Sequence, residues 1–164
     1  MTSSTFLALI LGTVLSCIVS RARAEEVGST APTTSEEIFH QRTTAMKIRL
    51  KIQDNVITAT LLDNATSRDF VSLLPISLTL EDYAATEKIS DLPRNLSTEG
   101  APAGSDPSIG DIAYYSPWGN LAIFYRDFRY SSGLIKLGKI DSGIEALNVP
   151  GSAKVTVELI EKSQ

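Results

Sequence analysis

The stretch Gly110–Phe128, GDIAYYSPWGNLAIFYRDF, contains two apolar, aromatic-rich runs joined by a short Ser-Pro-Trp-Gly-Asn connection. Aromatic and branched apolar residues favour strands, whereas Pro, Gly and Asn are typical of the turns between them. The pattern therefore predicts a β-hairpin with strands over Asp111–Ser116 and Asn120–Phe128. Because successive side chains of a strand point to opposite faces, we expect the neighbours Phe124 and Tyr125 to lie on different faces of this hairpin.

Alternation of apolar and polar residues predicts further strands on both sides of the hairpin. The clearest is Met46–Ile52, MKIRLKI, in which Lys and Arg occupy every second position. We expect these charges to keep an exposed edge of the sheet soluble. A two-residue turn is expected at Asp54-Asn55, because both side chains tolerate a left-handed backbone. The remaining strands are expected over Val56–Leu62, Ile76–Leu80, Leu134–Ile140 and Lys154–Ile160.

One helix and one helical turn complete the expected elements. The helix begins near Asn64, with Asn64 or Thr66 as its N-cap, and ends before Pro75. A short helical turn is expected over Ile144–Leu147, after Gly143. The fold class predicted is mainly β: a small, closed or nearly closed β-barrel with one α-helix and a short helical turn.

The chain opens on the uncharged apolar run Phe6–Val19, followed by Ala22-Arg23-Ala24. The run is short for a membrane span, which takes about 20 residues, and suits the hydrophobic region of a signal peptide. The residues before it contain no Lys or Arg, which departs from the usual pattern. We predict a signal peptide over residues 1–24, cleavage after Ala24, and export to the periplasm or the exterior.

A second interpretation of this leader is a lipid anchor. Val14-Leu15-Ser16-Cys17 loosely resembles a bacterial lipoprotein box, so the mature protein would be attached through Cys17. Residues 25–45 are rich in Glu, Ser and Thr, which predicts a flexible N-terminal linker. We expect no integral membrane span in the mature chain.

Composition narrows the classes of partner and cofactor. The formal net charge of the 164-residue chain is −4 and its basic residues are scattered, which argues against nucleic acid as a partner. Cys17 is the only cysteine and His40 the only histidine, and both precede the predicted barrel. The barrel therefore offers no Cys/His zinc site and no internal disulfide. We predict no metal and no cofactor.

The segment Glu81–Asp106 shows the least regular pattern of the barrel region, and we expect a long connection there. Long connections on a rigid scaffold often carry binding residues, whereas the alternative is a solvated loop with weak surface ion pairs. The candidate ligand-binding residues are Tyr83, Glu87, Lys88, Arg94 and, from the hairpin, Tyr125. Leu92, Pro93, Trp118 and Phe124 are the further candidates for the wall of such a pocket.

Five blocks of sequence together resemble the small bacterial cyclophilin-like family. They are MKIRLKI, the SLLP that ends the predicted helix, EKISDLPRNL, GDIAYYSPWGNLAIFY and GLIKLGKI. The resemblance covers about Met46–Glu161 and implies a cyclophilin-type barrel, assigned to residues 46–162, with a helix packed over one open end.

The resemblance does not extend to the isomerase signature. Prolyl-isomerase cyclophilins have F-H-R and F-M-x-Q-G-G-D segments, and this chain contains neither. Arg94 and Arg126 are the remaining candidates for a guanidinium that stabilises a rotating prolyl amide. Without a histidine in the barrel an ordinary hydrolase triad is unavailable, which leaves Glu87 and Asp91 as a candidate carboxylate pair. We expect a module that binds a small molecule or a peptide, with peptidyl-prolyl cis-trans isomerase as the alternative, and we assign no catalytic residue.

Overall fold

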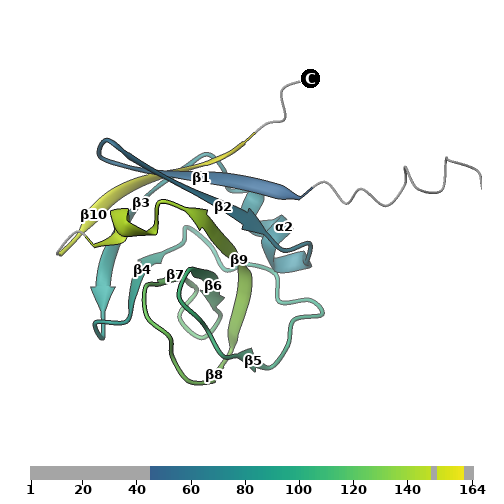
Figure 1. Ribbon diagram of the computed structural model, residues 1–164. Coiled ribbons are helices and arrows are strands. Elements are labelled where there is room, and N and C mark those ends of the chain that lie inside the picture. The colour runs from purple at the N-terminus through teal and green to yellow at the C-terminus, as the bar shows by residue number, and fades with distance from the viewer. Residues whose placement is uncertain (1–44, 149–150, 161–164) are drawn as a thin grey trace, which may run out of the picture.

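The computed structural model describes residues 45–148 and 151–160. The predicted signal peptide, the linker up to residue 44, Cys17 and His40 lie outside the described residues. Eight strands form a closed antiparallel barrel in the order β1-β10-β3-β4-β7-β6-β9-β2, and β5 pairs with β8 beside it (Figure 1). The elements are β1 Met46–Ile52, β2 Asn55–Leu61, α2 Ala65–Val71, β3 Ile76–Tyr83, β4 Glu87–Asp91, β5 Gly104–Ser105, β6 Asp111–Tyr115, β7 Asn120–Phe124, β8 Ser131–Ser132, β9 Leu134–Ser142, the 3₁₀ turn η1 Ile144–Leu147 and β10 Ala153–Leu159.

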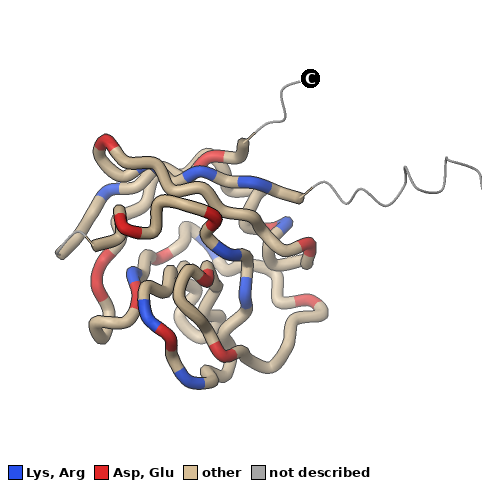
Figure 2. The backbone as a smooth tube through the Cα atoms, viewed as in Figure 1, with Lys and Arg blue, Asp and Glu red and all other residues tan. Residues whose placement is uncertain are grey.

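Strand β1 has the predicted bounds, but it is not an edge. It pairs with β2 on one side and β10 on the other, because closure of the barrel removes free edges. Its basic residues lie on the outer surface, where Arg49 and Lys51 contact Glu158 at 2.8 and 3.0 Å. Acidic and basic positions are interspersed along the chain in Figure 2. The charges of β1 thus serve cross-strand pairing as well as solubility.

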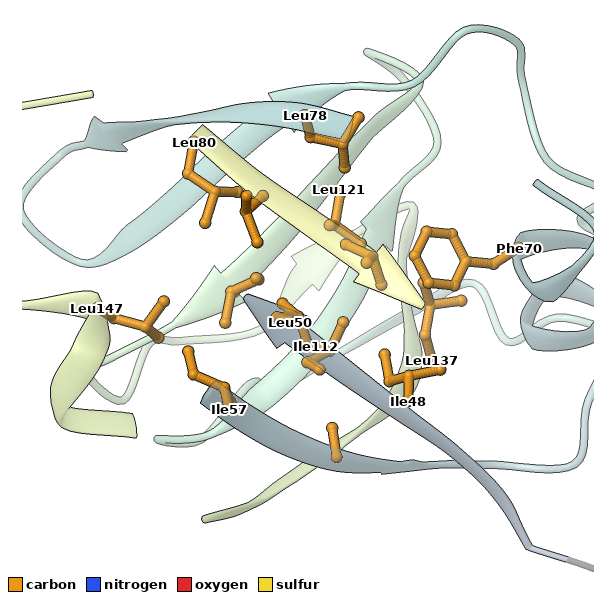
Figure 3. Close-up of a cluster of buried hydrophobic side chains, with 14 of the residues drawn as sticks. Ile48, Leu50, Ile57, Phe70, Leu78, Leu80, Ile112, Leu121, Leu137 and Leu147 are labelled. Carbon is orange, nitrogen blue, oxygen red and sulfur yellow. The ribbon is translucent and has the colours of Figure 1, made fainter. Parts of the chain in front are cut away.

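The inward-facing residues of the barrel strands form one hydrophobic core (Figure 3). Residues at every second position supply it, such as Ile48 and Leu50 of β1, each 1% exposed. Phe70 of α2 enters this core from one side and Leu147 of η1 from the opposite side in Figure 3. The barrel interior is therefore filled by side chains, and α2 packs against it as the family resemblance implies.

The helix begins as predicted at Asn64. The side chain of Asn64 accepts a hydrogen bond from the Ser67 amide at 2.7 Å, which satisfies one of the unpaired N–H groups of the first turn. Buried Ser67 donates from its hydroxyl to the Leu137 carbonyl of β9 at 2.9 Å. These two contacts fix the start of α2 against the barrel.

Several predicted boundaries were wrong. The first hairpin turn lies at Gln53-Asp54 rather than at Asp54-Asn55, because Asn55 already pairs with Ile52. Strand β7 ends at Phe124 rather than at Phe128, since the next two amides both donate to the Thr86 carbonyl, at 3.1 and 3.2 Å.

The segment Glu81–Asp106 is only partly a connection. Its start completes β3, and its residues Glu87–Asp91 form β4 in the barrel wall between β3 and β7. Polar Lys88 and Ser90 occupy the two buried positions of β4, so this strand lacks the apolar alternation that marks the others. The irregular part of the segment begins only after Asp91.

Candidate functional site

A hollow of about 200 Å³ lies on the outer face of the barrel over β4, β7 and β6. Its floor is a second apolar cluster, separate from the core, formed by Ala113, Ala122, Phe124 and Leu134 with Ile89 and Tyr115 packed against them. The floor exists because alternate residues of the central hairpin face outward while Leu121 and Ile123 face inward. The complete lining is Tyr83, Ala84, Thr86, Glu87, Ile89, Tyr115, Trp118, Asn120, Ala122, Phe124, Phe128, Ser131 and Leu134.

Exposed aromatic side chains surround the hollow. Trp118, in the hairpin turn, packs edge-on against Tyr83 and Tyr115, with ring centroids 5.4 and 5.3 Å apart. Tyr83, Trp118 and Phe128 are 41%, 56% and 43% exposed, although large apolar side chains are usually covered. Three exposed aromatic residues gathered around one hollow are typical of an interaction site.

The register places an acidic side chain between two aromatic ones. Tyr83 of β3 is paired with Glu87 of β4, and Glu87 is paired with Phe124 of β7. The turn that joins β3 to β4 holds Ala84 and Ala85 at φ 48° and 53°, a left-handed conformation that residues with a Cβ rarely adopt. This turn fixes Tyr83 opposite Glu87, and Ala84 itself lines the hollow.

Two oxygen atoms in this hollow are buried without a hydrogen-bond partner among the described residues. They are Oε2 of Glu87 and Oδ1 of Asn120. Burial raises the pKa of Glu87 from its ordinary 4.5 to about 7, because desolvation disfavours the charged carboxylate. Buried polar groups normally have a partner, so both oxygens are ready to accept a hydrogen bond from a ligand.

Lys88 does not lie in this hollow, although it is the next residue of β4. Its side chain is 2% exposed, and its ammonium lies 2.8 Å from Asp82 and donates to the Gly151 carbonyl at 3.1 Å. Tyr125 donates from its hydroxyl to the same Asp82 at 3.1 Å. The hydrogen bond from Lys88 is the main reason that the pKa of Asp82 is lowered. Lys88 and Tyr125 are thus brought together by a shared acid.

Arg94 belongs to a third location, beside the helix. It donates to both carboxylate oxygens of Asp69 in α2, at 2.6 and 2.9 Å, and to the Ser72 hydroxyl at 2.9 Å. Asp69 also accepts from the Ser97 amide at 2.7 Å. These contacts, the Arg94 hydrogen bond first, lower the pKa of Asp69 to about 2. The cluster holds the irregular segment after β4 against α2.

The five predicted ligand-binding residues therefore do not converge. Tyr83 and Glu87 line the hollow, Lys88 and Tyr125 share Asp82, and Arg94 contacts Asp69. Of the further wall candidates, Trp118 and Phe124 line the hollow, whereas Leu92 and Pro93 do not.

Comparison with known proteins identifies the barrel. The model of the cyclophilin-like family matches residues 50–158. The chain belongs to the cyclophilin-like family. A hypothetical protein from Archaeoglobus fulgidus, solved in solution, has a similar fold with a TM-score of 0.59 and 20% identity, over 73% of this chain and 98% of that one. A search of curated proteins found no match.

Sequence reasoning missed part of the lining of this hollow. Tyr115, Asn120 and Phe128 line the hollow, but the sequence pattern assigns them only to the strands of the hairpin. Pairing of β6 with β7 places Tyr115 opposite Asn120. That register would have followed from the hairpin turn, so the signal was present in the sequence.

Within residues 45–148 and 151–160, no group of three or more His, Cys, Asp or Glu side chains is arranged to hold a metal ion. No helix of the described part of the chain has the length and apolar character needed to cross a membrane.

Proposed function

We propose that this chain is an exported cyclophilin-like binding module that holds a small molecule or a peptide side chain in the hollow on its outer face. The observation that carries the proposal is the gathering of exposed Tyr83, Trp118 and Phe128 around one apolar floor. Pockets with apolar walls and a few placed polar groups are the usual form of ligand sites.

The size of the hollow limits the ligand. Sites for drug-sized molecules measure roughly 300–1,000 Å³, whereas this hollow measures about 200 Å³. It suits one side chain of a peptide or a single small ring. The part of a longer ligand outside the hollow would rest on the aromatic rim.

The isomerase alternative gains no support from the site. Arg94 is engaged by Asp69, and neither Arg94 nor Arg126 is in the lining of the hollow. A prolyl-peptide isomerisation assay addresses the alternative directly. Acceleration that is lost in Arg94→Ala or Arg126→Ala would establish the isomerase and displace the proposal of a module that only binds.

The binding test uses benzyl alcohol, a neutral ring that fits the hollow, and the fluorescence of Trp118, the single tryptophan of the chain. We expect a saturable change in fluorescence that Ala122→Leu abolishes, because the added carbons fill the floor. Ala101→Leu is the matched control, since Ala101 lines a different hollow. Binding that Ala122→Leu leaves unchanged would overturn the proposal, as would the absence of binding by both benzyl alcohol and its amine analogue benzylamine.

Folding of the variants is checked by ¹H–¹⁵N NMR spectra. If Ala122→Leu disturbs the barrel, Trp118→Ala replaces it, with binding followed by NMR shifts of the hollow's amides. Trp118 is 56% exposed, so its loss removes rim contacts without opening the core. Wild-type affinity in Trp118→Ala would then count against the proposal.

Export rests on the apolar run Phe6–Val19 and on Ala22-Arg23-Ala24. Expression of the full chain in a bacterium, followed by fractionation and intact mass of the product, tests it. A periplasmic product that begins at Glu25 supports signal cleavage, whereas a lipid-modified product that begins at Cys17 supports the anchor. A cytoplasmic product of full length contradicts both.

A further inference from the structure

We propose that the hollow takes a ligand with an ammonium group, which Glu87 binds between Tyr83 and Phe124 while an apolar body covers Ile89 and Ala122. This inference rests on the proposed binding function and names the chemical class of its ligand.

The carboxylate of Glu87 has no basic partner in the hollow. The lining contains no Lys, Arg or His, and Oε2 of Glu87 is buried without a hydrogen-bond donor among the described residues. Lys88, the nearest lysine in sequence, points to the opposite face of β4 and contacts Asp82. A buried acid without compensation is costly, and a bound cation would offset that cost. The pKa of Glu87, which desolvation raises to about 7, is consistent with a carboxylate that lacks a basic partner.

The neighbours of Glu87 suit a cation. The register pairs Glu87 with Tyr83 on one strand and Phe124 on the other, and Trp118 packs edge-on against Tyr83 at 5.4 Å between centroids. The faces of aromatic rings attract ammonium groups, and aromatic side chains around an acid are a recurrent way to bind them. A neutral ligand would gain contact with the rings but leave the carboxylate without a partner.

The rest of the floor defines the body of the ligand. Pairing of β4 with β7 places Ile89 beside Ala122 and Asp91 beside Asn120, so apolar residues lie between Glu87 and the far end of the hollow. Phe124 lies four positions after Asn120, which is about 13 Å along the strand at about 3.3 Å per residue. The unpaired Oδ1 of Asn120 marks that far end as a second acceptor. The shape favours an ammonium head attached to an apolar body.

The test compares two probes of nearly equal shape, benzylamine and benzyl alcohol. NMR titrations of the hollow's amides at about pH 8 keep the amine protonated and Glu87 mostly ionised. We expect benzylamine to bind about tenfold more tightly than benzyl alcohol, from one charge pair and one cation–π contact. In Glu87→Gln the preference should fall to within about twofold. Glu99→Gln, an exposed site that does not line this hollow, should keep the wild-type preference.

The outcomes separate this inference from the binding function on which it rests. Equal affinity for the two probes, or a preference for the amine that Glu87→Gln retains, overturns the ammonium site and leaves the binding module intact. Failure of both probes to bind overturns the binding module as well. Should Glu87→Gln alter the fold in NMR spectra, Glu87→Asp provides the second variant. Its shorter side chain keeps the charge but moves it away from Tyr83 and Phe124.

One further arm separates a free amine from a lysine side chain of a peptide. Nα-acetyl-lysine N-methylamide is compared with Nα-acetyl-norleucine N-methylamide, which lacks the ammonium. Preference for the lysine compound together with that for benzylamine points to peptides as the source. Preference for benzylamine alone points to free amines.

Discussion

Replacement of Glu87 by Gln should change how the stability of the barrel depends on pH. Burial raises the pKa of Glu87 from 4.5 to about 7 in the folded protein. Between these values the folded chain holds a proton that the unfolded chain has released. The free energy of unfolding contributed by Glu87 therefore falls as pH rises from about 4.5 to about 7, and stays at its lower level above that range.

The size of this effect follows from the same two values. A shift from 4.5 to about 7 corresponds to roughly 3 kcal/mol for a fully enclosed group, at about 1.4 kcal/mol for each pH unit. Glu87 is only partly buried, so screening by water reduces the expected loss to about 1–2 kcal/mol. Gln carries no charge in this range and should show no such loss.

The assay is urea unfolding at intervals from pH 5 to pH 8, on protein that begins at Glu25, after the predicted signal peptide. We expect the wild-type stability minus the Glu87→Gln stability to fall by about 1–2 kcal/mol across this range. Glu99→Gln, at an exposed position, should follow the wild type at every pH. A difference that is flat, or that rises with pH, would refute the assignment of Glu87 as a desolvated acid. Addition of benzylamine at pH 8 should stabilise the wild type more than Glu87→Gln, and so raise this difference again, if the ammonium site exists.

Two further predictions concern the contacts around the hollow. Asp82→Asn should destabilise the protein by about 1–3 kcal/mol in urea unfolding, because buried Lys88 loses its acidic partner. The control Asp141→Asn removes a more exposed ion pair with Lys47 and should destabilise the protein by less than about 1 kcal/mol. Equal losses of stability in the two variants would contradict the role of burial. The double change Ala84→Asn, Ala85→Gly should stabilise the protein by about 1–2 kcal/mol, because both residues are left-handed and Asn-Gly suits such a turn. A lower melting temperature in the double variant would show that this turn is not strained.

The strands that could be predicted from the sequence are those with one apolar, buried face. In β1, apolar residues at every second position specify both the strand and its inner face, and Asn64 specifies the start of α2 by its capping chemistry. Strand β4 could not be found in this way. Its buried positions hold Lys88 and Ser90, and the turn before it is Ala84-Ala85, which lacks the Gly, Asn or Asp that marks a hairpin.

The candidate site was predictable only in part, because the sequence does not reveal that Glu87 and Lys88 belong to strand β4. The sequence predicts Glu87 and Tyr83 as polar and ring-bearing residues of a connection, and both line the hollow. Lys88 is predicted for the same reason but faces the other way, because successive side chains of a strand point to opposite faces. Arg94 lies after the strand, and its direction depends on Asp69, a helical partner that spacing alone does not reveal.

Strand β4 links the fold to the proposed function because the charged residues on its two faces differ in their partners. On one face the ammonium of Lys88 is buried and is paired with Asp82 from the adjacent strand. On the other face Glu87 is partly buried between two aromatic residues, with Oε2 unpaired among the described residues. Folding alone accounts for the first arrangement, since its partner is within the barrel. No partner among the described residues completes the second arrangement, and that asymmetry is the strongest support for our proposal that a ligand binds on the outer face of β4 rather than in the filled interior.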